Sequence, residues 1–115
     1  MVIEDDPTIQ DVLKILFQME SIDAYWASCG AEALSMLEHI PVPKFVLLDG
    51  RLPDIHGLEL ASKIHERTDE SATIYLCSAD SECEEMIVGT KIRGFIPKPF
   101  DADRVVAIIK DRLAS

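Results

Sequence analysis

Short apolar runs alternate along the chain with segments in which apolar residues recur every three or four positions. The runs predict strands at residues 2–3, 24–28, 45–48, 73–77 and 93–97. The periodic segments predict helices at about 7–19 and 30–39, a third that begins near Gly57, a fourth near Ser81 and a fifth after Asp101. Strands that alternate with helices form a parallel sheet covered on both faces. The pattern therefore predicts one doubly wound α/β domain over residues 1–115, with right-handed connections.

Three positions carry the signals that begin a helix. Asp6 followed by Pro7 is typical of an N-cap and a first helical turn. Asp101 stands in the same position before the last periodic segment, and Ser81 with Glu84 predicts a capping box before the fourth. These signals place the expected helix starts directly after the expected strand ends.

Composition and charge exclude several classes of function. The chain has 115 residues and a hydrophobic fraction of 48%, enough for a single folded core. Its formal net charge of −10 argues against binding nucleic acid or an anionic membrane surface through this domain. No apolar run reaches the roughly 20 residues of a membrane-spanning helix, and the first residues do not resemble a signal peptide. We therefore expect a cytoplasmic protein with reduced cysteines, and we expect the three scattered histidines at the surface.

Polar side chains follow four of the predicted strands. Glu4 and Asp5 follow the first strand, Asp49 the third, Ser78 the fourth and Lys98 the fifth. Because ligands bind outside the carboxyl ends of the strands in an open parallel sheet, we expect these residues to meet at one edge. A few carboxylate oxygens suit Mg²⁺, which keeps several waters and recruits phosphate oxygens. The set predicts a site for a divalent cation and a phosphoryl group.

Each of these polar residues also has a purely structural interpretation. Asp6 is assigned to the helix cap and not to the cluster. Asp49 could cap a turn with its carboxylate, or it could be a nucleophile that forms an aspartyl phosphate. Ser78 alone could form a turn. Lys98, which stands between two prolines, could pair with a carboxylate or hold a phosphoryl oxygen.

Five stretches, found in order, produce a resemblance that runs from one end of the chain to the other. They read VIEDDPTI, ASCGAEAL, FVLLDGRLPDIHG, LCSAD and GFIPKPF. The chain resembles the receiver domain of bacterial two-component response regulators. The resemblance implies a flavodoxin-like (βα)5 fold, with a five-stranded parallel sheet in the order 2-1-3-4-5 and helices on both faces. It also implies a cis peptide bond between Lys98 and Pro99.

The same resemblance assigns the phosphoacceptor and the metal ligands. Asp49 matches the residue that accepts a phosphoryl group in a Mg²⁺-dependent reaction. Asp5, Asp49 and the backbone carbonyl of Arg51 match the direct ligands of Mg²⁺ or Mn²⁺, and Glu4 matches a ligand that acts through water. The donor implied is a sensor histidine kinase or a phosphotransfer protein, and the output is an unknown partner or effector domain.

The resemblance further implies a conformational switch. Ser78 matches the switch hydroxyl, Lys98 the phosphate-binding lysine, and Phe95 the aromatic residue whose rotamer follows the hydroxyl. We also expect Arg51 and Asp80, two residues beyond the phosphoacceptor and the hydroxyl, to pair across the site and slow the entry of water. The resemblance then implies a signalling switch that slowly dephosphorylates itself and is not primarily an enzyme, and we expect no effector domain in this chain.

Two segments depart from the family pattern. Only residues 1–3 precede Glu4, so the central first strand is short and we expect reduced stability or a truncated start. The stretch between Ser78 and Lys98 is a couple of residues short, and residues 89–94 lack the usual lead into the last strand. Because this stretch belongs to the output face, we expect atypical partner binding there.

Three other functions fit parts of the pattern. A pseudo-receiver would keep the fold as a phosphorylation-independent binding module; the altered residues 89–94 favour it and the complete polar set opposes it. An Asp-nucleophile phosphohydrolase would have a second acid where Arg51 stands. A flavin-binding domain would have a phosphate-binding loop rich in Gly, Ser or Thr where Glu4 and Asp5 stand.

Overall fold

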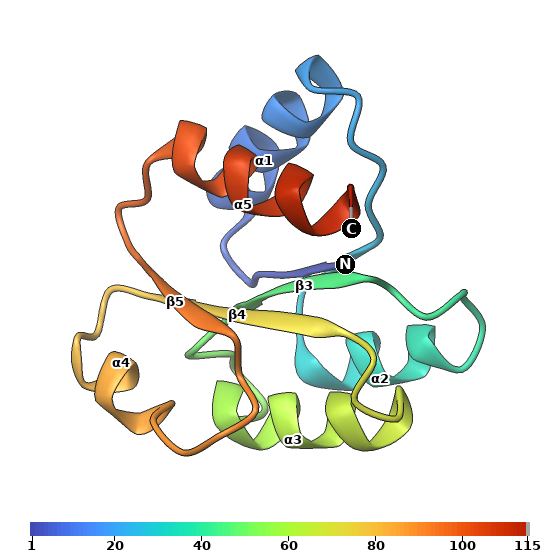
Figure 1. Ribbon diagram of the computed structural model, residues 1–115, viewed down its shortest axis with the longest axis vertical. Helices are drawn as coiled ribbons and strands as arrows, with labels where there is room; N and C mark the ends of the chain where they lie inside the picture. The colour runs from blue at the N-terminus through green and yellow to red at the C-terminus, as the bar shows by residue number, and fades with distance from the viewer. Residues whose placement is uncertain (115) are drawn as a thin grey trace.

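The computed structural model describes residues 1–114 and contains a five-stranded parallel sheet (Figure 1). The strand order is β2-β1-β3-β4-β5, which confirms the predicted doubly wound fold. In chain order the elements are β1 (Val2–Ile3), α1 (Pro7–Met19), β2 (Trp26–Ala27), α2 (Gly30–Leu37), β3 (Phe45–Asp49), α3 (Gly57–Arg67), β4 (Thr73–Ser78), α4 (Glu82–Met86), β5 (Gly94–Pro97) and α5 (Ala102–Leu113). Ser115, the last residue of the predicted domain, lies outside the described residues.

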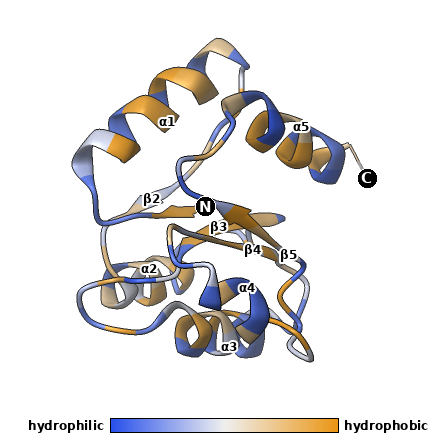
Figure 2. Ribbon diagram, turned by 90° about the vertical axis from the view of Figure 1, so that its left-hand side faces the viewer, coloured by the Kyte–Doolittle hydropathy of each residue, from blue (hydrophilic) through white to orange (hydrophobic). Residues whose placement is uncertain are grey.

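Helices cover both faces of the sheet. α1 and α5 lie on one face, and α2, α3 and α4 lie on the other (Figure 1). Along β3, Val46 and Leu48 pack into the cluster under α2 and α3, whereas Phe45 and Leu47 pack into the cluster under α1 and α5. This alternation follows from the two-residue period of a strand. Figure 2 shows the resulting hydrophobic strands in the middle of the molecule. The sheet therefore separates two cores.

The first strand is short, as expected, but it is hydrogen-bonded on both sides. β1 pairs with β2 and with β3 over two residues each. The ladder continues at Met1, whose carbonyl accepts from the Leu47 N–H and whose amino group donates to the Phe45 carbonyl at 2.8 Å. These bonds place the chain that follows β1 next to the end of β3. The expected loss of stability stays a prediction.

Helix starts follow the local signals at two of the three expected positions. The Asp6 carboxylate accepts from the Thr8 N–H at 2.9 Å, and the Asp101 carboxylate accepts from the Asp103 N–H at 2.9 Å. The predicted capping box at Ser81 is wrong: Ser81 has helical dihedral angles and makes no side-chain cap bond. Asp80 takes this role, since its carboxylate accepts from the N–H of residue 82 at 2.9 Å.

Other predicted boundaries differ by a few residues. β2 covers only Trp26–Ala27 instead of 24–28, because it is an edge strand that pairs with the short β1 alone. α2 ends at Leu37, two residues early, whereas β4 continues to Ser78. His39 and His56 are exposed as predicted, but His65 is buried, with 8% of its surface accessible, because it lies on the inner face of α3.

The cysteines are free thiols, and two of the three are buried. The bond between Lys98 and Pro99 is cis, as the resemblance implied. Within residues 1–114, none of the helices combines the length and the apolar character needed to cross a membrane.

Candidate functional site

Three carboxylates gather where β1 and β3 end. Glu4, Asp5 and Asp49 each offer an oxygen, and these oxygens lie within 4.8 Å of one another. Glu4 and Asp49 are buried and Asp5 is exposed, so the cluster opens toward solvent on one side. The pairing of β1 with β3 fixes this geometry, because Ile3 lies opposite Leu48 and the acids follow directly. The structure therefore brings these three carboxylates together, as the sequence predicted.

A lysine from the end of β5 completes the cluster. The Lys98 ammonium lies 2.7 Å from Glu4 Oε1 and 3.5 Å from Asp49 Oδ2. Burial acts to lower the pKa of Lys98, but the hydrogen bond with Glu4 and the charges of Asp49 and Glu4 outweigh it, so that this pKa is raised. Lys98 therefore stays protonated and bridges two buried carboxylates.

The surroundings of Asp49 shift its pKa. Only 6% of its surface is accessible, and its Oδ1 accepts from the Arg51 N–H at 3.0 Å. Burial raises the pKa of Asp49, the neighbouring Glu4 and Asp5 raise it further, and the Arg51 N–H partly opposes them; the result is a pKa of about 7. Without a cation, Asp49 is thus partly protonated at neutral pH.

The charge of the cluster fits a divalent cation. With all three carboxylates ionised, the cluster and its one ammonium would carry a formal charge of −2. Crowding of this kind is unfavourable unless a cation or protons offset it. The all-oxygen donor set with one exposed side suits Mg²⁺ or Mn²⁺, which retain water ligands. The residues present therefore fit a small hard cation.

The loop after β3 is held close to the site by a glycine. The Gly57 N–H donates to the Gly50 carbonyl at 3.0 Å, which starts α3 against the end of β3. A Cβ at Gly57 would lie 2.8 Å from the Gly50 Cα and 2.9 Å from the Asp49 carbonyl oxygen, so only glycine fits this approach. This contact positions the Arg51 backbone beside the carboxylates.

Ser78 lies across the site at the end of β4. Its side chain is buried, and its hydroxyl oxygen accepts from the Asp80 N–H at 3.0 Å. With Asp49 and Lys98 it lines an open depression of about 420 Å³. The depression is large enough for a phosphoryl group beside the Asp49 carboxylate.

Arg51 and Asp80 form the predicted pair at the rim of this depression. The Arg51 guanidinium bonds to the Asp80 carboxylate, and this bond is the main reason why the pKa of Asp80 is held below its usual range. The Arg51 side chain is 71% exposed and that of Asp80 is 22% exposed. The bridge therefore lies between the depression and solvent.

Phe95 lies in β5, two residues before the end of the strand, and pairs with Leu76. It is partly buried and packs against the cluster under α2 and α3. Neither Asp49 nor Ser78 is among its strand partners.

Two supporting residues escaped the sequence analysis. Gln10 donates its amide to the Glu4 carbonyl at 2.8 Å and to the Ala27 carbonyl at 3.1 Å, which ties the acidic segment to the end of β2. Asp54 accepts from the Gly30 and Ala31 N–H groups, both at 2.9 Å, and so caps α2 from outside. The sequence gives one local signal for the cap of α2 by Asp54: residue 29, which directly precedes the helix, supplies no capping side chain.

The comparisons with known proteins identify the family of the chain. The model of the response regulator receiver domain family matches residues 1–110. The chain belongs to this family, and it is a receiver domain of a two-component response regulator. Receiver domains of this family bind Mg²⁺ at an acidic pocket, and Glu4, Asp5 and Asp49 form an acidic cluster in this chain.

Two bacterial relatives match nearly the whole chain. The DNA-binding response regulator MtrA of Mycolicibacterium smegmatis is 27% identical over 115 residues, which cover 98% of this chain and 49% of that protein. The transcriptional regulatory protein TrcR of Mycobacterium tuberculosis is 26% identical over 114 residues, covering 98% of this chain and 44% of that protein. The chain spans about half the length of these curated relatives.

Solved structures of the same fold can be aligned with nearly the whole chain. A CheY-like receiver domain protein of Methanospirillum hungatei has a TM-score of 0.87 at 24% identity, covering 98% of this chain and 90% of that one. The response regulator TrrA of Thermotoga maritima, in complex with Mg²⁺ and BeF, has a TM-score of 0.83 at 28% identity, covering 96% and 95%. These likenesses confirm the flavodoxin-like, CheY-like architecture.

Proposed function

We propose that residues 1–115 form one phosphorylatable receiver domain in which Asp49 is the phosphoacceptor. The observation that carries this proposal is the position of Asp49 between an acidic pair and a lysine: its oxygens lie near Glu4 and Asp5 on one side and 3.5 Å from the Lys98 ammonium on the other. A carboxylate held between a cation site and an ammonium is suited to attack a phosphoryl group.

Asp5, Asp49 and the backbone carbonyl of Arg51 would hold the metal ion, and Glu4 would act through a water. Mg²⁺ or Mn²⁺, when bound, neutralises negative charge on the phosphoryl oxygens and orients them. Glu4 is suited to an indirect role because Lys98 already occupies one of its oxygens at 2.7 Å and the Asp6 N–H donates to the other at 3.2 Å. Asp5, exposed and next in sequence, is free to turn toward the cation.

Transfer then proceeds by attack of one Asp49 oxygen on the donor's phosphorus. Oδ1 is held by the Arg51 N–H, which leaves Oδ2 facing Lys98 as the attacking oxygen. The Oδ2–P bond forms as the N–P bond of a phosphohistidine breaks, and the imidazole leaves with the electron pair of that bond. Lys98 stabilises charge on the phosphoryl oxygens as a point charge. Positioning and electrostatics supply most of the catalysis.

Phosphorylation is read out by Ser78 and Phe95. In the structure the Ser78 oxygen accepts from the Asp80 N–H. On phosphorylation the Ser78 hydroxyl turns to donate to a phosphoryl oxygen, and the segment after β4 moves with it. Phe95 then turns inward from its partly buried position, which shifts a pre-existing equilibrium between two states of the output face.

The role that follows is a signalling switch of the cytoplasm and not primarily an enzyme. Its donors are a sensor histidine kinase or a phosphotransfer protein, and its output is a partner or an effector domain. With a net charge of −10, this domain does not itself bind nucleic acid or membranes. The Arg51–Asp80 bridge adds a kinetic role, since it lines the same open depression as Asp49 and can slow the entry of water there.

Incubation with acetyl phosphate, with and without Mg²⁺, tests the proposal by intact mass. We expect one phosphoryl adduct that requires Mg²⁺ and is absent from Asp49→Asn. Asp11→Asn, an exposed acid in α1, is the matched control and should be modified like the parent. A parent that stays unmodified both with acetyl phosphate and with a panel of phosphorylated kinases would contradict the proposal and favour a pseudo-receiver.

A further inference from the structure

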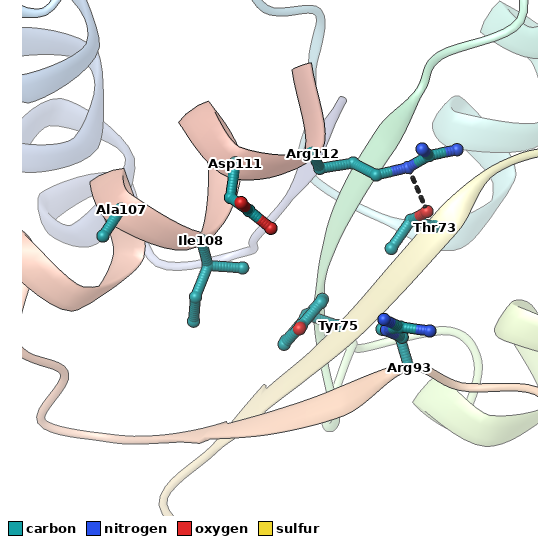
Figure 3. Close-up of a pocket in the computed structure, with 7 residues that line it drawn as sticks. All are labelled: Thr73, Tyr75, Arg93, Ala107, Ile108, Asp111 and Arg112. Carbon is teal, nitrogen blue, oxygen red and sulfur yellow. Dashed lines mark hydrogen bonds between the residues drawn. The ribbon is translucent and has the colours of Figure 1, made fainter. Parts of the chain in front are cut away.

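A second cavity lies at the opposite end of β4 from the aspartate site. It has a volume of about 580 Å³ and is formed between the start of β4, the residue before β5 and the carboxyl-terminal half of α5 (Figure 3). This volume is typical of small-ligand sites. Thr73 begins β4 and Ser78 ends it, so the two sites lie about 16 Å apart along the strand. A ligand here would be separate from the phosphoryl group.

Two guanidinium groups line this cavity. Arg112 reaches from α5 to β4, where its Nε donates to the Thr73 hydroxyl oxygen at 2.6 Å (Figure 3). This bond uses one donor and fixes the plane of the group, which leaves the terminal amino groups for another acceptor. Arg93 lines the same cavity beside Tyr75, and its side chain makes no hydrogen bond or salt bridge with any residue within 1–114.

Most of the other cations of the chain have carboxylate partners. Six of the nine other lysines and arginines form salt bridges with carboxylates: Arg51, Lys63, Arg67, Lys91, Lys98 and Lys110. Acids outnumber bases in this protein by 21 to 11, so a carboxylate partner is easy to find. Neither Arg93 nor Arg112 forms a salt bridge with another described residue. Two such groups beside one cavity favour an anionic ligand, because guanidinium matches carboxylate and phosphate oxygens in pairs.

The floor of the cavity is a fixed aromatic ring. Tyr75 stacks on Phe45 with ring centroids 5.3 Å apart and an angle of 24° between the planes. It also lies over Gly94, where a Cβ would be 2.7 Å from the ring. Ile108 adds an apolar wall from α5, as Figure 3 shows. The floor is therefore rigid and suited to the apolar part of a ligand.

From these contacts we propose that the cavity binds a small organic anion, a phosphate or a carboxylate, with its anionic group between Arg93 and Arg112 and its apolar part against Tyr75. The carboxylate of Asp111 also lines the cavity. The inference does not depend on phosphorylation of Asp49.

The test is an NMR titration of the parent chain with phenyl phosphate and with benzoate, in buffer without divalent cations. We expect the amide signals of Thr73 and Gly94 to shift with a saturable dependence on concentration. Arg93→Gln should weaken this binding about ten-fold. Because the Arg93 side chain makes no bond within the described residues, this variant should keep its melting temperature. The matched control is Arg104→Gln, an exposed arginine of α5 that does not line the cavity and should bind like the parent.

The relative strength of the two probes identifies the anion as a phosphate or a carboxylate. Three results would overturn the proposal. Shifts confined to Ser78 and its neighbours would mean that phosphate enters only the aspartate site. Equal weakening by Arg93→Gln and Arg104→Gln would mean diffuse attraction. Binding of benzyl alcohol as strong as that of benzoate would mean that no anion is recognised.

Discussion

Replacing Asp49 by asparagine should stabilise the protein when divalent cations are absent. Burial and the neighbouring carboxylates raise the pKa of Asp49 from 3.8 to about 7. A difference of three pKa units corresponds to about 4 kcal/mol, by which the ionised side chain destabilises the folded state. Solvent reaches part of this cluster and asparagine loses the attraction to Lys98, so we expect a net gain of about 1–2 kcal/mol.

The stability difference between Asp49→Asn and the parent should depend on pH. Because the folded state holds the Asp49 proton more tightly than the unfolded chain, the destabilisation is absent below the unfolded pKa of 3.8 and complete above about 7. Thermal melts in EDTA should therefore show Asp49→Asn melting about 5 °C or more above the parent at pH 8, with a difference that shrinks toward pH 5. Asp11→Asn removes the same charge at an exposed position and should match the parent.

A variant that melts at or below the parent at pH 8 would refute this reasoning. A difference that does not change with pH would also refute it, because the cause would then lie outside the titration of Asp49. In either case the carboxylate cluster would be better solvated, or better paired with Lys98, than its burial indicates.

Three further predictions concern the cation, the rim and α3. Mg²⁺ at ten times its dissociation constant should stabilise the parent by about 1.4 kcal/mol and Asp49→Asn far less. A melting temperature of the parent that does not change with Mg²⁺ concentration would contradict the metal site. Arg51→Ala should shorten the half-life of the phosphorylated protein, followed by intact mass after Mg²⁺ removal, because the bridge to Asp80 is lost; an unchanged half-life would contradict the role of the rim. Burial lowers the pKa of His65, so the folded state loses stability as pH falls below about 6.5. In His65→Gln the urea midpoint of unfolding should therefore depend less on pH than in the parent. Parallel pH profiles of the two proteins would contradict this prediction.

Much of the fold follows from local patterns in the sequence. The alternation of apolar runs with helical periodicity predicts the parallel sheet, and Asp6 and Asp101 cap their helices through bonds to residues two positions on. Such contacts depend only on neighbours in the chain. The capping box at Ser81 fails because the chain turns one residue earlier, at Asp80, which also bonds to Arg51 from a distant loop.

The composition of the site is likewise predictable, because parallel strands bring their carboxyl ends to one edge. The pairings between side chains inside the site cannot be predicted in this way. That Lys98 lies closer to Glu4 than to Asp49 depends on the length of the glutamate side chain and the register of β1, and neither is visible in a motif. The capping of α2 by Asp54 and the burial of His65 arise in the same way from packing between elements far apart in sequence.

The most direct test of the account is to locate the phosphoryl group on the chain. The protein would be phosphorylated with acetyl phosphate and Mg²⁺, reduced with borohydride to convert the acyl phosphate into homoserine, digested and sequenced by mass spectrometry. We predict conversion at Asp49 alone. Conversion at Asp5 or at another acid, with Asp49 intact, would contradict the assignment of Asp49 as the phosphoacceptor on which the proposed switch depends.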